Sequence, residues 1–131
     1  MFGRKRWGVM VGALVVVAVG AAPRQAFAIK EFFDEFKAVY VKPDSSDANE
    51  KALVAAVETA KCNVCHAGSN KKERNAYGNA LADLLDKKED KKNAEKIRQA
   101  LETVAAMPSA DGGPTFGELL KQGKLPSPAA Q

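Results

Sequence analysis

The sequence predicts an all-α fold, built from short amphipathic helices in one small domain. Apolar residues recur every three or four positions along most of the chain after residue 29, which is the repeat of a helix face. No segment alternates apolar and polar residues with the period of two that a half-buried strand requires. The region 29–131 has roughly 100 residues, which suits a single domain with a modest core.

Each predicted helix is bounded by a residue typical of a helix end. Pro43 follows the first apolar stretch and disfavours helical backbone just before it. Asp47, Asn70, Asp90 and Thr115 are capping residues that precede the later stretches. The expected segments are Lys30–Val41, Glu50–Lys61, Asn70–Leu85, Lys91–Ala106 and a short helix opening at Thr115, with a frayed tail at 126–131.

All the cysteine and histidine of the chain lies in one five-residue motif, Cys62-Asn63-Val64-Cys65-His66. The pattern C-x-x-C-H is the attachment site of a c-type haem. Each of the two thiols can form a thioether to one haem vinyl group. The imidazole that follows can then ligate the iron from one side. We therefore expect one covalently attached haem c, bound through Cys62, Cys65 and His66.

Three other uses of the motif fit the sequence less well. A thioredoxin-like redox pair expects a strand–helix–strand setting, whereas the flanking segments are predicted helices. A structural zinc site needs about four protein ligands, and the motif offers three. A plain disulfide between Cys62 and Cys65 would give His66 no role.

The N-terminus has the pattern of a cleaved secretory signal. The basic segment Arg4-Lys5-Arg6 precedes an apolar run, Gly8–Ala22, and the small-x-small triplet Ala26-Phe27-Ala28 follows. The run is shorter than the roughly 20 residues of a membrane span. We expect a signal peptide at 1–28, cleavage after Ala28 and a periplasmic or otherwise exported domain at 29–131. An uncleaved anchor is the alternative.

Removing the signal changes the charge of the protein. The whole chain has 20 Lys+Arg against 16 Asp+Glu, but four of the basic residues and none of the acidic ones precede residue 29. The remaining domain is formally neutral, so composition does not favour nucleic-acid binding. We expect redox partner proteins, and no membrane span after signal cleavage.

The exported helical domain with one C-x-x-C-H motif and a late Met107-Pro108 pair resembles the small monohaem cytochrome c family. The resemblance implies a helical domain wrapped around the haem, electron transfer, and a methionine as second axial iron ligand. Met107 is the sole methionine after the signal. Those cytochromes usually have a proline about a dozen residues after the motif, whose carbonyl orients the ligating imidazole. This chain has no proline between His66 and Met107.

Several alternatives stay open at this stage. Met107 either ligates the iron beside His66 or only completes a helix face, in which case lysine, Tyr77 or an open position takes its place. An open position would suit a five-coordinate haem protein that binds a small gas or senses redox state. Peroxidase-type catalysis lacks its usual second histidine, so we do not expect an enzyme. Arg74 and Tyr77 either pair with haem propionates or are a solvated arginine and a core tyrosine.

Overall fold

The computed structural model describes residues 30–69, 72–110 and 112–127, and this part of the chain is all-α, as predicted. Two isolated β-bridges are the only strand-like pairing there. The predicted signal peptide, Asn70 and residues 128–131 lie outside the described residues. The helices are α1 (Lys30–Tyr40), α2 (Ala48–Ala60), the 3-10 helix η1 (Lys61–Val64), α3 (Ala76–Leu84), α4 (Ala94–Ala105) and α5 (Phe116–Lys121).

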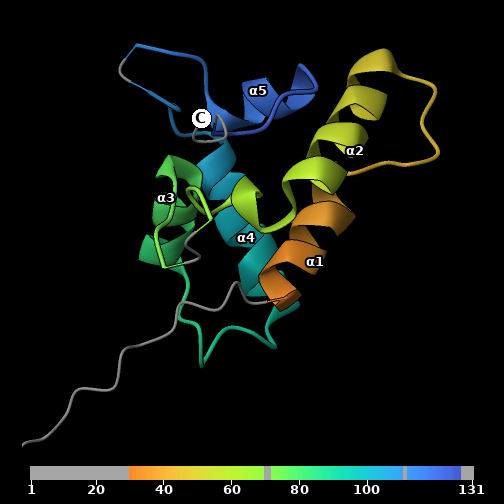
Figure 1. Ribbon diagram of the computed structural model, residues 1–131. Coiled ribbons are helices and arrows are strands. Elements are labelled where there is room, and N and C mark those ends of the chain that lie inside the picture. Colours follow the sequence, from red (N-terminus) through yellow and green to blue (C-terminus); the bar gives the residue numbers. More distant parts are fainter. Residues whose placement is uncertain (1–29, 70–71, 111, 128–131) are drawn as a thin grey trace, which may run out of the picture.

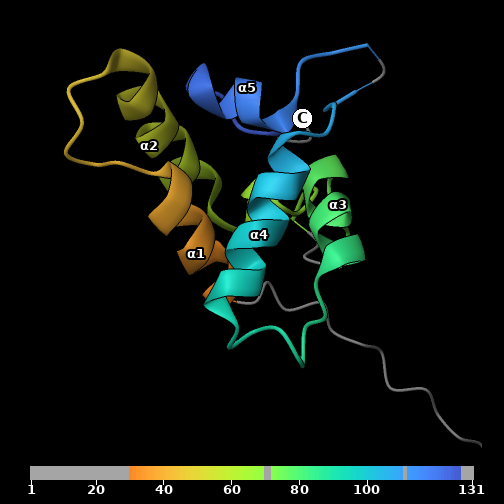
Figure 2. The same cartoon turned by 180° about the vertical axis from the view of Figure 1, so that it is seen from behind.

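Helix α4 lies at the centre of the arrangement. It packs against α1 on one side and α3 on the other, as seen from behind in Figure 2. The short helix α5 lies across one end of α4 and also contacts α2 (Figure 1). The turn η1 continues α2 and brings residues 61–64 in beside α3 and α4 (Figure 1). The C-x-x-C-H motif therefore extends from the C-terminal end of α2 toward the middle of the domain.

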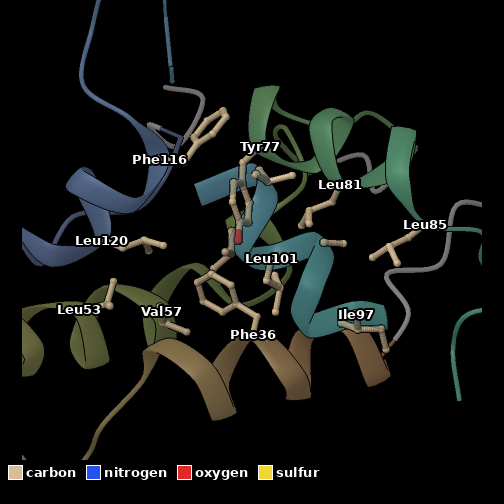
Figure 3. Packing of buried hydrophobic residues seen from close by; sticks show 13 residues of the cluster. Phe36, Leu53, Val57, Tyr77, Leu81, Leu85, Ile97, Leu101, Phe116 and Leu120 are labelled. Atoms are coloured by element: carbon tan, nitrogen blue, oxygen red, sulfur yellow. The ribbon is translucent and has the colours of Figure 1, made fainter. Parts of the chain in front are cut away.

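The hydrophobic core draws side chains from all five α-helices (Figure 3). Tyr77 points from α3 into its centre, between the rings of Phe36 and Phe116. The ring centroids lie 5.9 Å and 5.2 Å from that of Tyr77, both in edge-to-face geometry. Such pairs contribute about 0.5–1.5 kcal/mol each beyond the area they bury. The buried hydrophobic residues are Phe36, Leu53, Val57, Val64, Tyr77, Leu81, Leu85, Ile97, Ala100, Leu101, Val104, Phe116 and Leu120.

Two predicted helix starts are confirmed because their caps are local. The Asp47 carboxylate accepts hydrogen bonds from the backbone N–H groups of Asn49 and Glu50 at 2.9 and 3.0 Å. The Thr115 hydroxyl accepts from the N–H of Glu118, whose carboxylate accepts from the N–H of Thr115 in return. This reciprocal pair is a capping box, and it starts α5 directly after the Ser109–Pro114 loop.

Helix α4 starts later than the sequence predicts. Asn93, not Asp90, caps it by accepting from the N–H of Lys96 at 3.0 Å. The Asp90 carboxylate instead accepts from the N–H of Asp86 and from the Lys96 ammonium, both at 2.7 Å. Through these two hydrogen bonds, Asp90 stabilises the loop between α3 and α4.

The chain after α5 is packed, not frayed, as far as it is described. Gly123 ends α5 with a positive φ of 75°, and a Cβ there would lie 2.5 Å from the carbonyl oxygen of Asn49 in α2. The turn sends the chain back, so that Leu125 contacts the core. Pro126 and Ser127 are buried, contrary to the predicted tail.

No helix among the described residues is long and apolar enough to cross a membrane.

Candidate functional site

The two cysteines lie on a tight turn at the end of α2. Lys61 leaves the helix with a positive φ of 49°, which costs a non-glycine residue roughly 1–3 kcal/mol. The turn then closes on the carbonyl oxygen of Cys62, which accepts from the N–H groups of Cys65 and His66 at 3.3 and 3.1 Å. Cys62, Cys65 and His66 are thus gathered on one short stretch of fixed backbone.

Both cysteines are free thiols and partly buried. Burial, with a smaller contribution from Cys62, raises the pKa of the Cys65 thiol to about 12. Cys65 therefore stays protonated at neutral pH. Catalytic redox cysteines have the opposite property, a lowered pKa that maintains the reactive thiolate. Cys65 therefore lacks the reactivity of a thioredoxin-like centre.

The His66 side chain is buried, with 6% of the residue exposed, and its orientation is fixed by a main-chain carbonyl. Its Nδ1 lies 3.1 Å from the carbonyl oxygen of Glu73. A carbonyl can only accept, so Nδ1 carries the proton in this hydrogen bond. That tautomer places the basic lone pair on Nε2, the form in which imidazole ligates iron.

Glu73 lies on a segment that folds back along the motif. Its carbonyl also accepts from the N–H of Ala67 at 3.1 Å, and an antiparallel bridge pairs His66 with Arg74. The carbonyl of Glu73 thus accepts from the imidazole, which is the role that the resemblance implies for a proline carbonyl. The missing proline is therefore no obstacle to orienting the imidazole, because any residue can supply this acceptor.

Asn75 joins this turn to α3. Its side-chain N–H₂ donates to the carbonyl oxygens of Asn63 and Val64 at 3.2 and 3.0 Å. Its Oδ1 accepts from the N–H of Gly78 at 2.9 Å, which caps α3. Its backbone N–H donates to the Cys65 carbonyl at 3.1 Å. One residue both starts α3 and binds the turn between the two cysteines.

The predicted start of the third helix is therefore wrong. The sequence predicts helix from Asn70, whereas α3 begins at Ala76. Residues 72–75 form a turn and a bridge instead. The carbonyl of Glu73 and the N–H of Asn75 bind the motif, so these two groups are not available for helical hydrogen bonds.

The other candidate residues lie around the motif. Arg74 is partly buried and adjoins His66 through the bridge. Tyr77 is fully buried in the core, and its hydroxyl has no hydrogen-bond partner among the described residues. Burial, followed by Cys65 and Tyr40, raises the pKa of this phenol. The core interpretation of Tyr77 thus fits the structure better than contact with a propionate.

Met107 follows α4 and is partly buried against the core. Its backbone is held at both ends, because its N–H donates to Val104 and its carbonyl accepts from Phe116 at 3.0 Å. Phe116 in turn contacts Tyr77, two residues from Asn75. The structure therefore brings Cys62, Cys65 and His66 together on one turn. Met107 lies on a different segment, which a backbone hydrogen bond joins to Phe116.

The donor set fits haem c. Two free cysteine thiols and a buried imidazole whose Nδ1 is hydrogen-bonded are groups that suit thioether attachment and iron ligation. In the described part of the chain, no three His, Cys, Asp or Glu side chains form a group that could hold a metal ion by themselves.

Two residues that support the site were not predicted from the sequence. The carbonyl of Glu73 accepts from His66 and orients its imidazole, and the side chain of Asn75 binds the turn between the cysteines. A main-chain acceptor leaves no mark in the sequence. Gly78 was the available signal for α3, because a glycine inside a helix often marks a close backbone approach.

Comparisons with models of protein families, with curated protein sequences and with solved structures gave no match for this chain.

Proposed function

We propose that this chain is an exported monohaem c-type cytochrome that carries single electrons between redox partner proteins. The observation that carries the proposal is the hydrogen bond from His66 Nδ1 to the Glu73 carbonyl, within a motif that supplies two free thiols. A histidine that only filled the core would not need the two cysteines placed beside it on the same turn.

The cysteines would attach the cofactor without a change of oxidation state. Each thiol would add across one vinyl double bond, so that a sulfur–carbon bond would form and the thiol hydrogen would end on the neighbouring carbon. The short turn from Cys62 to Cys65 sets the separation of the two attachment points.

His66 would hold the iron from one side, and Met107 is our proposed ligand on the other. Haem supplies an iron that cycles between Fe(III) and Fe(II), and axial ligands and burial set its potential. The Glu73 carbonyl keeps His66 in the ligating tautomer and increases its basicity. Met107 lies at a helix end followed by Pro108, where its position depends on a loop and not on a continuous helix.

The function is tested by a redox titration of the protein purified from the exported fraction. A carrier gives a reversible one-electron curve, and its reduced form takes up carbon monoxide slowly because the sixth position is filled. Rapid uptake of carbon monoxide by the reduced protein would contradict the carrier and favour a gas-binding haem protein. A Cys62→Ala/Cys65→Ala variant is the control, and it should lose its haem on denaturation.

A further inference from the structure

Asn75 makes three hydrogen bonds that join one end of α3 to the motif, and a fourth that caps α3. Its two side-chain N–H groups reach the carbonyls of Asn63 and Val64, the two residues between the cysteines. The assignment of its amide atoms is forced, because those carbonyls can only accept and the N–H of Gly78 can only donate. Every polar group of the side chain is therefore used.

The shape of this turn matters for attachment. Two sulfur atoms and one imidazole nitrogen have to meet three fixed points of a single rigid ring system, the two vinyl groups and the iron. A turn that changes shape would bring these three groups together only part of the time. Holding it rigid in advance removes that cost, as preorganisation does at other binding sites.

We propose that Asn75 is a positioning residue that holds the Cys62–His66 turn in the shape that receives haem. The role in receiving haem rests on the proposed function. The clamp itself, which is the set of hydrogen bonds from Asn75 to Asn63, Val64 and Cys65, is present in the folded chain without haem. Helix capping alone does not account for Asn75, since Asp, Ser and Thr cap as well or nearly as well. Only an amide both accepts from Gly78 and donates to two carbonyls.

Asn75→Asp separates the two roles. The carboxylate still accepts from the N–H of Gly78 and caps α3, but it has no N–H to donate and places a negative charge against two carbonyl oxygens. Asn93→Asp is the matched control. Asn93 caps α4 by accepting from Lys96, so the same substitution there keeps a cap and removes no bond to the motif.

The test compares the parent protein, Asn75→Asp, Asn93→Asp and Asn75→Ser, each purified as the mature exported chain. Serine keeps a capping oxygen and offers one hydroxyl in place of two N–H donors. The first readout is the fraction of chains that carry both thioethers. It is measured by denaturing the protein, alkylating any free thiol and determining the mass of the polypeptide by mass spectrometry. The second readout is hydrogen exchange at the N–H groups of Cys65 and His66, which bind Cys62 within the turn.

We expect Asn75→Asp to lower the doubly attached share severalfold and to speed exchange at these two amides by about tenfold or more, since two hydrogen bonds are lost. Asn75→Ser should change both in the same direction. Asn93→Asp should match the parent in both.

The inference would be overturned if Asn75→Asp showed the same haem attachment and the same amide exchange as the parent. If Asn75→Asp does not accumulate, the same result in Asn75→Ser would overturn it. Equal changes in Asn93→Asp would also overturn it, because the effect would then be one of capping or charge in general. A parent protein that carries no haem would overturn the proposed function instead, and the exchange measurement would still decide whether the clamp exists.

Discussion

The carbonyl of Cys65 and the backbone of Gly78 approach so closely that α3 has no room for a side chain at that point. A Cβ built on Gly78 would lie 2.0 Å from the Cys65 carbonyl oxygen and 2.9 Å from the carbonyl carbon. Both atoms belong to the main chain, so neither can rotate away. Gly78 thus allows α3 to pack directly on the turn that bears the cysteines.

We predict that Gly78→Ala destabilises the protein. In an open helix this substitution gains up to about 1 kcal/mol from helix propensity. Here the overlap forces the turn away from α3, and overpacking of this kind costs about 1–3 kcal/mol. Urea unfolding should show a net loss of about 1–2 kcal/mol. Gly113→Ala is the control, because its nearest contact would be an ordinary 3.4 Å, and a parent-like Gly78→Ala would contradict the packing.

The two core tyrosines should respond in opposite ways to loss of the hydroxyl. The Tyr77 hydroxyl is buried with no partner among the described residues, whereas the Tyr40 hydroxyl donates to the Leu101 carbonyl at 3.1 Å. Tyr77→Phe should leave stability unchanged or raise it by up to about 1 kcal/mol, and Tyr40→Phe should lower it by about 1 kcal/mol. Thermal unfolding of both variants checks this. A clear loss in Tyr77→Phe would mean that the hydroxyl has a partner in the haem-loaded protein.

The Asp90 carboxylate should make part of the stability depend on acid pH. Its hydrogen bond to Lys96, helped by that of the Asp86 N–H, lowers the pKa of Asp90 below its usual 3.8. A lowered pKa means that the charged form stabilises the fold. Its contribution is complete above the unfolded value and is lost as the pH falls through the folded one.

Asp90→Asn keeps an acceptor for Asp86 but removes the charge. The stability difference between parent and variant should therefore be greatest near neutral pH and should disappear at a pH below 3.8. Denaturant unfolding over a pH series measures the difference. Asp44→Asn removes a carboxylate at an exposed loop position and is the control variant. A difference for Asp90→Asn that persists at the lowest pH would contradict the assignment.

Met107→Ala separates a ligand from a core residue. A thioether is a soft, neutral ligand that favours Fe(II), so its removal should lower the reduction potential and open the sixth position. The reduced variant should then bind carbon monoxide readily, whereas the parent binds it poorly. The oxidised parent should show the weak near-infrared sulfur-to-iron band, and the variant should lack it. Identical spectra and identical binding would show that Met107 only packs against the core.

The sequence was sufficient where structure depends on neighbours along the chain. The apolar faces of the helices could be predicted from the three-to-four-residue spacing of their apolar residues. The caps at Asp47 and Thr115 could be predicted because each side chain binds a backbone N–H only two or three residues ahead. The C-x-x-C-H motif is likewise local, so its three residues could be named without a structure. The all-α class followed from the same signals.

The sequence was not sufficient where a contact joins distant segments. Asn70 and Asn75 are equally good capping residues, and the choice between them depends on carbonyls at Asn63 and Val64, more than ten residues away. The orientation of His66 depends on a main-chain oxygen, which any residue could provide. Pro126 has the sequence signature of a tail, but a tight turn at Gly123 returns it to the fold.

The central claim is that Cys62 and Cys65 hold a haem through thioether bonds. Extraction of the purified exported protein with acidified acetone, followed by mass measurement of the polypeptide, tests it most directly. We predict that the colour stays with the protein and that the mature chain, beginning at Ile29, is heavier by one haem, with neither thiol open to alkylation. Haem recovered in the solvent, or a chain of unmodified mass with two reactive thiols, would contradict the account.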